Sequence, residues 1–103
     1  MKYSIYQAPI TEDFVFRPFG LVRDKIVPDF SHNWEGHYNK VFEGELSTQD
    51  NDLVILEHLF HVFNVDHPDG YKGRSLSVSD IVVIEEGAER RVYYCDSFGW
   101  EVL

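Results

Sequence analysis

Glu57, His58 and His61 fall within about one turn of a predicted helix, and such a grouping could bind a metal ion. Helix neighbours three or four residues apart lie side by side, so the three side chains share one surface. A zinc-protease helix needs two histidines four residues apart with a glutamate directly after the first, and the order EHLFH differs from this. His67 in the following turn could complete a site. We nevertheless interpret the three as the polar face of the helix, and expect no metal and no cofactor.

The nucleophilic residue types are present without the partners that would activate them. Cys95 lies in the strand-like stretch YYCD, whose neighbouring side chains provide no cation to lower the thiol pKa, so a buried structural thiol is expected. The stretch 75–80 is rich in serine and ends in Asp80, but it lacks the G-x-S-x-G pattern of hydrolases. Its side chains are expected to accept hydrogen bonds from backbone N–H groups where the next strand begins. The segment Gly70–Arg74 could contact a phosphate, but two basic residues are weak evidence for this.

Negative charge is concentrated in the middle of the chain. The 103 residues carry a net charge of -9, which argues against direct nucleic-acid binding through a general basic surface. Residues 41–69 contain seven acidic residues and no Lys or Arg. This segment either forms a solvated surface that maintains solubility, or a face that meets a basic protein partner. The candidate binding residues on it are Glu43, Glu45, Asp50, Asp52 and Glu57.

The elements that would position these residues are mostly strands. Alternating and β-branched runs predict strands over 2–8, 38–46, 81–84, 90–96 and 100–103. Apolar residues at helical spacing predict one main helix near 51–63 with a stripe of seven residues toward the sheet. They are Leu53, Leu56, Phe60 and Phe63, widened by Ile55, Leu59 and Val62. We expect an extended segment from Phe14 to Phe19, one helical turn over 20–25 and an irregular loop over 27–37.

These elements predict a single α+β domain over residues 1–103: a small antiparallel sheet of about four to five strands packed against that helix. Gly44 in the second strand suggests a bulge or close packing by another element. There is no apolar run of the roughly 20 residues that a membrane span requires. The first residues lack a secretory pattern, and a single cysteine fits a reducing cytoplasm. The sequence leaves the oligomeric state open.

The second half of the chain resembles the YodL-like domain, a small family of Gram-positive bacteria, their integrative elements and phages. The residues that carry the resemblance are NVDHPDGYKGRSLSVSDIVVI (64–84) and YYCDSFGW (93–100), together with YSIYQ, YNKVFEGEL and the Leu/Phe helix of the first half. The loop 27–37, with Trp34, departs from the pattern. The residues carried over by this resemblance are His67, Pro68, Gly73, Ser75, Ser77, Ser79, Asp80, Asp96, Ser97 and Gly99.

The resemblance implies no established enzymatic activity. It implies turn positions at Gly73 and Gly99 and capping roles at Asp80 and Asp96, with His67, Arg74 and Asp96 as the first candidates for a site. It also implies a mobile-element accessory protein that counters host defences. The corresponding hypothesis is a non-catalytic interaction module that binds a basic surface, on a host-defence or nucleic-acid-binding protein, through residues 41–69.

Two alternatives remain open. The first is a small enzyme or small-ligand-binding domain that uses the segments 67–80 and 95–99, with His67, Ser79 and Asp96 as polar groups. The second is a nucleic-acid-binding small barrel, against which the net charge of -9 argues.

Overall fold

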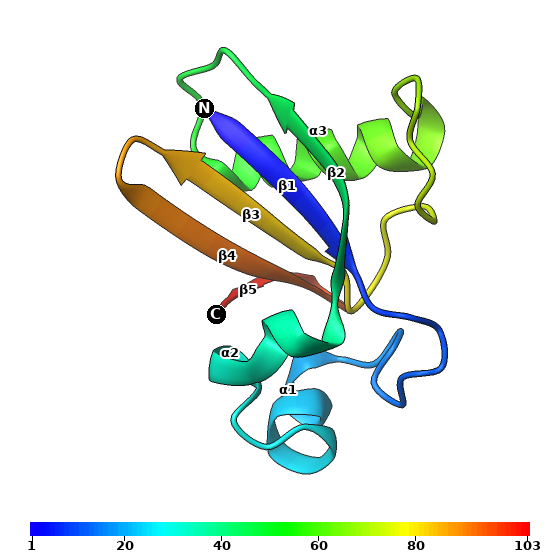
Figure 1. Ribbon diagram of the computed structural model, residues 1–103. Helices are drawn as coiled ribbons and strands as arrows, with labels where there is room; N and C mark the ends of the chain where they lie inside the picture. The colour runs from blue at the N-terminus through cyan, green and yellow to red at the C-terminus, as the bar shows by residue number, and fades with distance from the viewer.

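The computed structural model describes residues 1–103 and contains one five-stranded antiparallel sheet (Figure 1). The strands are β1 (Lys2–Gln7), β2 (Asn39–Glu45), β3 (Ile81–Glu86), β4 (Glu89–Asp96) and β5 (Gly99–Val102). Their spatial order is β2-β1-β3-β4-β5, so β3 is central and β2 and β5 form the edges. The four β-branched residues that begin β3 are all buried, two on each face of the sheet, as the uninterrupted apolar run predicts. The α+β class is therefore confirmed.

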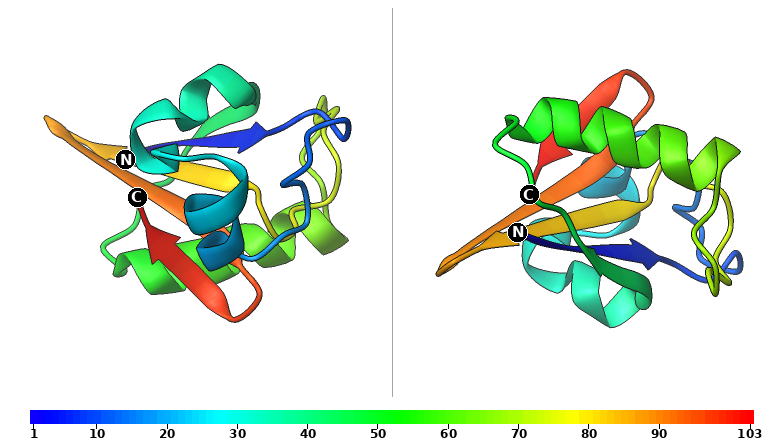
Figure 2. Two further views of the ribbon diagram at one scale, coloured as in Figure 1. Left: turned by 90° about the horizontal axis from the view of Figure 1, so that it is seen from below. Right: turned by 90° about the horizontal axis from the view of Figure 1, so that it is seen from above.

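The helix α3 (Asp52–Val65) covers one face of the sheet (Figure 2). It begins where the Asn51 side chain accepts a hydrogen bond from the backbone N–H of Val54, at 3.0 Å. It is the longest helix in the chain, and no helix has both the length and the apolar character needed to cross a membrane.

The buried stripe of α3 is narrower than the predicted one, although all its members were predicted. The side chains that pack on the sheet are Ile55, Leu56, Leu59 and Phe63. Leu53 and Phe60, which were expected in the core, are 60% and 37% exposed. Apolar residues occupy so much of the helix circumference that spacing alone predicts too wide a stripe.

The opposite face carries short helical segments rather than an irregular loop. They are α1 (Phe19–Leu21), a π-helical turn (η1, Val22–Ile26), α2 (Phe30–Asn33) and a 3₁₀ turn (η2, Trp34–His37). The predicted helical turn over 20–25 lies in this layer. The predictions of one main helix, of an extended Phe14–Phe19 segment and of a loop over 27–37 are therefore corrected. Figure 2 shows the sheet between this layer and α3.

Aromatic packing explains this second layer. Phe14, Phe30 and Tyr94 are fully buried in one cluster, and Phe30 contacts both others edge-on at centroid distances of 5.7 Å. Trp34 joins the same cluster and is 4% exposed. Short helical turns without periodicity are stabilised here by tertiary contacts, because isolated helices of this length are not stable in water.

Gly44 on edge strand β2 allows the close packing that the sequence predicts. A Cβ atom at Gly44 would lie 2.6 Å from the Tyr3 hydroxyl, so the Tyr3 ring occupies the space of the missing side chain. The pairing of β1 with β2 also shifts register between Ile5 and Tyr6. The edge strand is therefore bulged as well as tightly packed.

Candidate functional site

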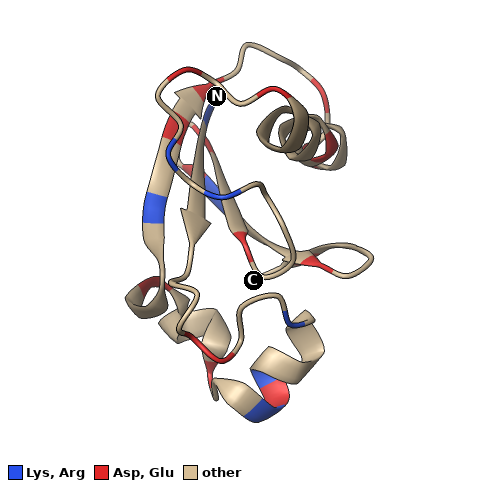
Figure 3. Ribbon diagram, turned by 90° about the vertical axis from the view of Figure 1, so that its right-hand side faces the viewer, with Lys and Arg blue, Asp and Glu red and all other residues tan.

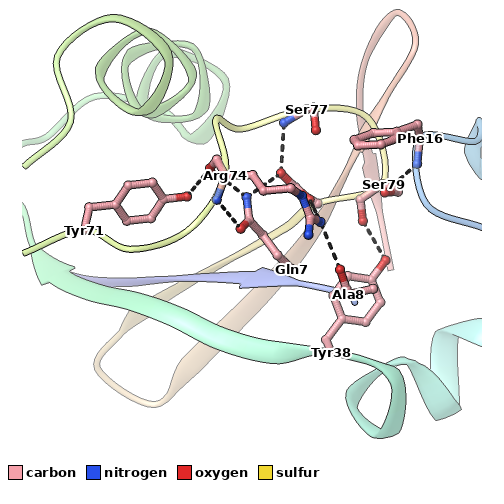
Figure 4. A network of polar contacts seen from close by, with 9 residues as sticks. Gln7, Ala8, Phe16, Tyr38, Tyr71, Arg74, Ser77 and Ser79 are labelled. Atoms are coloured by element: carbon pink, nitrogen blue, oxygen red, sulfur yellow. Dashed lines mark hydrogen bonds and ion pairs between the residues drawn. The ribbon is translucent and has the colours of Figure 1, made fainter. Parts of the chain in front are cut away.

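A polar network fastens the long segment between α3 and β3 to the end of β1 (Figure 4). The Gln7 side chain donates to the backbone carbonyl of Arg74 at 2.9 Å and to Asp80 Oδ2 at 3.0 Å. Its carbonyl oxygen accepts from the Arg74 N–H at 2.9 Å. One amide side chain thus holds two points of the segment in place.

Asp80 is the most deeply buried ionisable group of this network. Its side chain is fully buried, and Oδ2 also accepts the backbone N–H of Ser77 at 2.9 Å. Oδ1 has no hydrogen-bond partner, and its nearest cationic atom is Arg74 Nη2 at 3.9 Å. Burial raises the pKa of Asp80 to about 6, and the hydrogen bonds and the Arg74 charge only partly offset this. Asp80 therefore titrates much closer to neutral pH than an exposed aspartate.

Ser79 supports the backbone where β3 begins. It adopts a left-handed conformation (φ 86°), and its hydroxyl accepts the Phe16 N–H at 3.0 Å while its carbonyl accepts the Tyr38 hydroxyl at 2.6 Å. Together with the Asp80 bond to Ser77, this agrees with the expectation that the 75–80 stretch satisfies backbone N–H groups. Ser77 Oγ, in contrast, is buried without a partner.

Arg74, a candidate from the sequence, contacts mainly its own chain. Its Nη2 donates to the Ala8 carbonyl at 2.9 Å, and its guanidinium lies 5.8 Å from the centre of the Phe16 ring. With Lys72 it lines a cavity of about 220 Å³, and its Nε is buried without a partner. The segment Gly70–Arg74 thus places two cations, Lys72 and Arg74, at one cavity. Arg74 already donates a hydrogen bond to the backbone.

His67 and Asp96 occupy separate places and contact backbone groups. The His67 Nε2 lies 2.6 Å from the Phe63 carbonyl at the end of α3, and its ring packs on Tyr71. Asp96 Oδ1 accepts the N–H groups of Phe19 at 3.1 Å and Ser97 at 2.8 Å. The cavity that Asp96 lines includes neither His67 nor Ser79. The structure brings residues 79–80 beside Cys95 through backbone hydrogen bonds, but it does not bring His67, Ser79 and Asp96 into one pocket.

Two of the predicted acidic residues are paired with cations. Asp52 accepts two hydrogen bonds from Arg91, at 2.6 and 3.0 Å, and one from the Tyr93 hydroxyl. Burial acts to raise the pKa of Asp52, but the Arg91 and Tyr93 hydrogen bonds outweigh it and the pKa is lowered. Glu43 lies 3.2 Å from Lys2 Nζ and 2.8 Å from Lys40 Nζ. Hydrogen bonds from Lys40 and then Lys2 lower the pKa of this exposed carboxyl.

The remaining acidic residues of the 41–69 segment are exposed and form no ion pair. They are Glu45, Asp50, Glu57, Asp66 and Asp69. The helix α3 carries no Lys or Arg on any of its faces, as the charge colouring shows (Figure 3). The segment therefore keeps unpaired negative charge on the outside of the sheet–helix layer.

A groove between α3 and β5 is the feature that the sequence did not indicate. Its cavity of about 190 Å³ is lined by Phe60 and Glu57 from the helix and by Trp100 and the β4–β5 turn from the sheet. Phe98, at the tip of that turn, is 98% exposed. In Figure 3 the turn and α3 project from the same side of the molecule. No sequence signal indicates the groove, because Phe60 is as apolar as the buried residues of α3 and only its 37% exposure in the structure sets it apart.

Cys95 lies on the groove side of β4 and is buried, as expected. Burial, followed by the negative charges of Asp80, Asp96 and Glu57, raises the thiol pKa to about 12. The thiol is therefore neutral near pH 7 and is a poor nucleophile.

The helix grouping considered for a metal is divided between two cavities. Glu57 lines the α3–β5 groove, whereas His58 lines a cavity of about 250 Å³ beside Asp50. No three His, Cys, Asp or Glu side chains gather closely enough to hold a metal ion together.

Comparison with known proteins gives one match. No curated protein and no solved structure matches the chain. The family model of the YodL-like domain matches residues 2–103. Both halves are therefore covered, including the 27–37 segment. The chain belongs to the YodL-like domain family.

Proposed function

We propose that the chain is a non-catalytic interaction module that binds a basic surface of a partner protein. The observation that carries the proposal is the set of exposed, unpaired carboxylates on the 41–69 segment. Unpaired like charges on one segment repel each other, and a cationic partner relieves that repulsion and accelerates association.

The charge available to a partner is smaller than the sequence suggests. Arg91 neutralises part of the charge at Asp52, and two lysines surround Glu43. The binding contribution is therefore expected from Glu45, Asp50 and Glu57, with Asp66 and Asp69 extending the field at the end of α3.

We further propose that the protein acts in the cytoplasm of Gram-positive bacteria as an accessory protein of a mobile element, the setting that the YodL-like resemblance implies. The corresponding partner is a host-defence or nucleic-acid-binding protein. Its basic surface is of the kind that normally binds a phosphate backbone. The net charge of -9 disfavours direct nucleic-acid binding.

The alternative of a small enzyme or ligand-binding domain has weaker support. Its polar groups His67, Ser79 and Asp96 accept or approach backbone groups of this chain. The observation in its favour is the cavity beside Arg74 and Lys72, next to buried polar atoms without partners. Measuring the binding of small anions to the native protein and to the Arg74→Gln variant would test the ligand-binding alternative against the interaction module.

The test uses a lysine-rich synthetic peptide as probe, at low and at high salt. The variant Glu45→Gln, Asp50→Asn, Glu57→Gln is compared with a control, Asp13→Asn, Asp29→Asn, Glu35→Gln, which changes the net charge equally at exposed positions elsewhere. The proposal expects affinity to fall sharply in the first variant, to persist in the control, and to weaken with salt. Equal losses in both variants would mean that only the net charge matters, and the proposal would be wrong.

A further inference from the structure

We infer that the groove between α3 and β5 receives an extended cationic segment of a partner, which joins the sheet as a strand beside β5. This inference rests on the proposed function and specifies how and where the basic partner binds.

The outer edge of β5 is open. β5 pairs only with β4, and the Leu103 N–H donates to the Val92 carbonyl at 2.9 Å. Hydrogen-bonding direction alternates along an antiparallel strand. The backbone N–H and C=O groups of Trp100 and Val102 therefore point away from β4, where a further strand would pair with them.

The two edges of the sheet differ in their protection. On β2 the side chains of Lys40, Glu43 and Glu45 are exposed and the strand is bulged, which are the features that natural proteins use to prevent pairing with another chain. β5 carries one exposed charged residue, Glu101, but it has no proline, no lysine and no bulge, and its exposed Val102 adds apolar surface. An open edge of this kind is a template for strand addition.

The groove beside this edge suits the side chains of an added strand. Trp100 pairs with Cys95 and Val102 pairs with Tyr93, so both project toward the α3 side of the sheet. Alternate residues of an added strand would project to the same side, into the cavity of about 190 Å³ between Phe60 and Trp100. Phe60 and Val102, at 37% and 68% exposure, provide the apolar surface for such a side chain.

The charge of the groove selects a cationic occupant. No Lys or Arg lines the cavity, and Glu57 is an exposed carboxylate there without an ion pair. Asp96 is already hydrogen-bonded to Phe19 and Ser97, so Glu57 is the group that would meet a Lys or Arg of the partner. A second copy of this chain fits poorly, because two molecules of charge -9 would bring their Glu57 carboxylates together.

The experiment measures the affinity of a short synthetic peptide in which lysine alternates with valine and leucine. Val102→Pro removes the outward N–H and preserves the bonds to β4, since proline is tolerated on an edge strand. Val102→Ala is the matched control, because it removes the side chain and keeps the N–H. We expect Val102→Pro to weaken binding about tenfold, Val102→Ala to weaken it less, and a peptide with glutamate in place of lysine not to bind. Thermal unfolding of both variants checks that they fold.

The outcomes separate this inference from the proposed function. Equal affinities of Val102→Pro and Val102→Ala, with binding lost in Glu57→Gln, would refute strand addition and leave the acidic-face proposal standing. Equal binding of the lysine and glutamate peptides would refute the cationic occupant. Concentration-dependent dimerisation that Val102→Pro abolishes, without peptide binding, would identify a second copy as the occupant and overturn the inference.

Discussion

As the pH falls from 7 toward 4.5, the native protein should become more stable relative to a variant in which Asp80 is replaced by an uncharged residue. The perturbation is Asp80→Asn, which keeps an oxygen to accept from Ser77 and Gln7 but removes the titrating group. The folded pKa of Asp80 is about 6, compared with the ordinary value of 3.8 for an aspartate. Between pH 3.8 and pH 6, Asp80 is mostly protonated in the folded state and mostly ionised in the unfolded state. The ionised side chain therefore opposes folding above about pH 6, and this opposition decreases as the pH falls.

The magnitude follows from the two pKa values. Near pH 7 the folded and unfolded carboxyls are both largely ionised, and near pH 4.5 only the folded one is mostly protonated. The native protein should gain about 2 kcal/mol relative to Asp80→Asn over this interval. Urea unfolding followed by tryptophan fluorescence, at both pH values, measures the difference in free energy of unfolding.

Asp52→Asn provides a control of opposite sign. Hydrogen bonds from Arg91 and Tyr93 leave the folded pKa of Asp52 lowered, so its stabilisation is present above the unfolded pKa and is lost as the pH falls through the folded pKa. A native-minus-Asp80→Asn difference that stays constant, or that decreases toward acid pH, would show that Arg74 holds Asp80 as a stable carboxylate and would refute the reasoning.

Three further predictions address packing and reactivity. Gly44→Ala should cost about 1–3 kcal/mol, because its Cβ would lie 2.6 Å from the Tyr3 hydroxyl; Gly20→Ala, with open space around it, should be neutral or stabilising in the same urea assay. Leu59→Ala should cost about 2–5 kcal/mol and Phe60→Ala clearly less, because Leu59 is 1% exposed and Phe60 37%; equal costs in calorimetry would contradict the facing of α3. Cys95 should react with a thiol reagent near pH 8 only after unfolding, because the thiol is buried and its pKa is about 12; rapid labelling of the native protein would disprove this.

The strands and the position of α3 could be predicted because their signals are local. The run Ile81–Ile84 and the turn-bounded apolar stretch before Phe63 each carry their own pattern. The limits of the buried stripe of α3 could not be predicted, because Leu53 and Phe60 are as apolar as the residues that are buried. The helical turns at Phe30 and Trp34 escaped prediction because long-range aromatic contacts stabilise them.

The candidate site shows the same division. The backbone-capping roles of Ser79 and Asp80 follow from their residue types beside a strand. Their partner Gln7 is 73 residues from Asp80, and nothing in the local sequence indicates that contact. The pairing of Asp52 with Arg91 and the meeting of Phe60 with Trp100 likewise depend on how the sheet places distant segments together.

The central place of β3 has a consequence for synthesis of the chain. Ile81 and Val83 belong to the aromatic cluster on one face, while Val82 and Ile84 belong to the cluster under α3. β1, the first of these five strands in the chain, has only β2 to pair with until β3 has been made. Neither apolar layer can close before β3 emerges, so this domain must remain unassembled until most of its own residues have been synthesised.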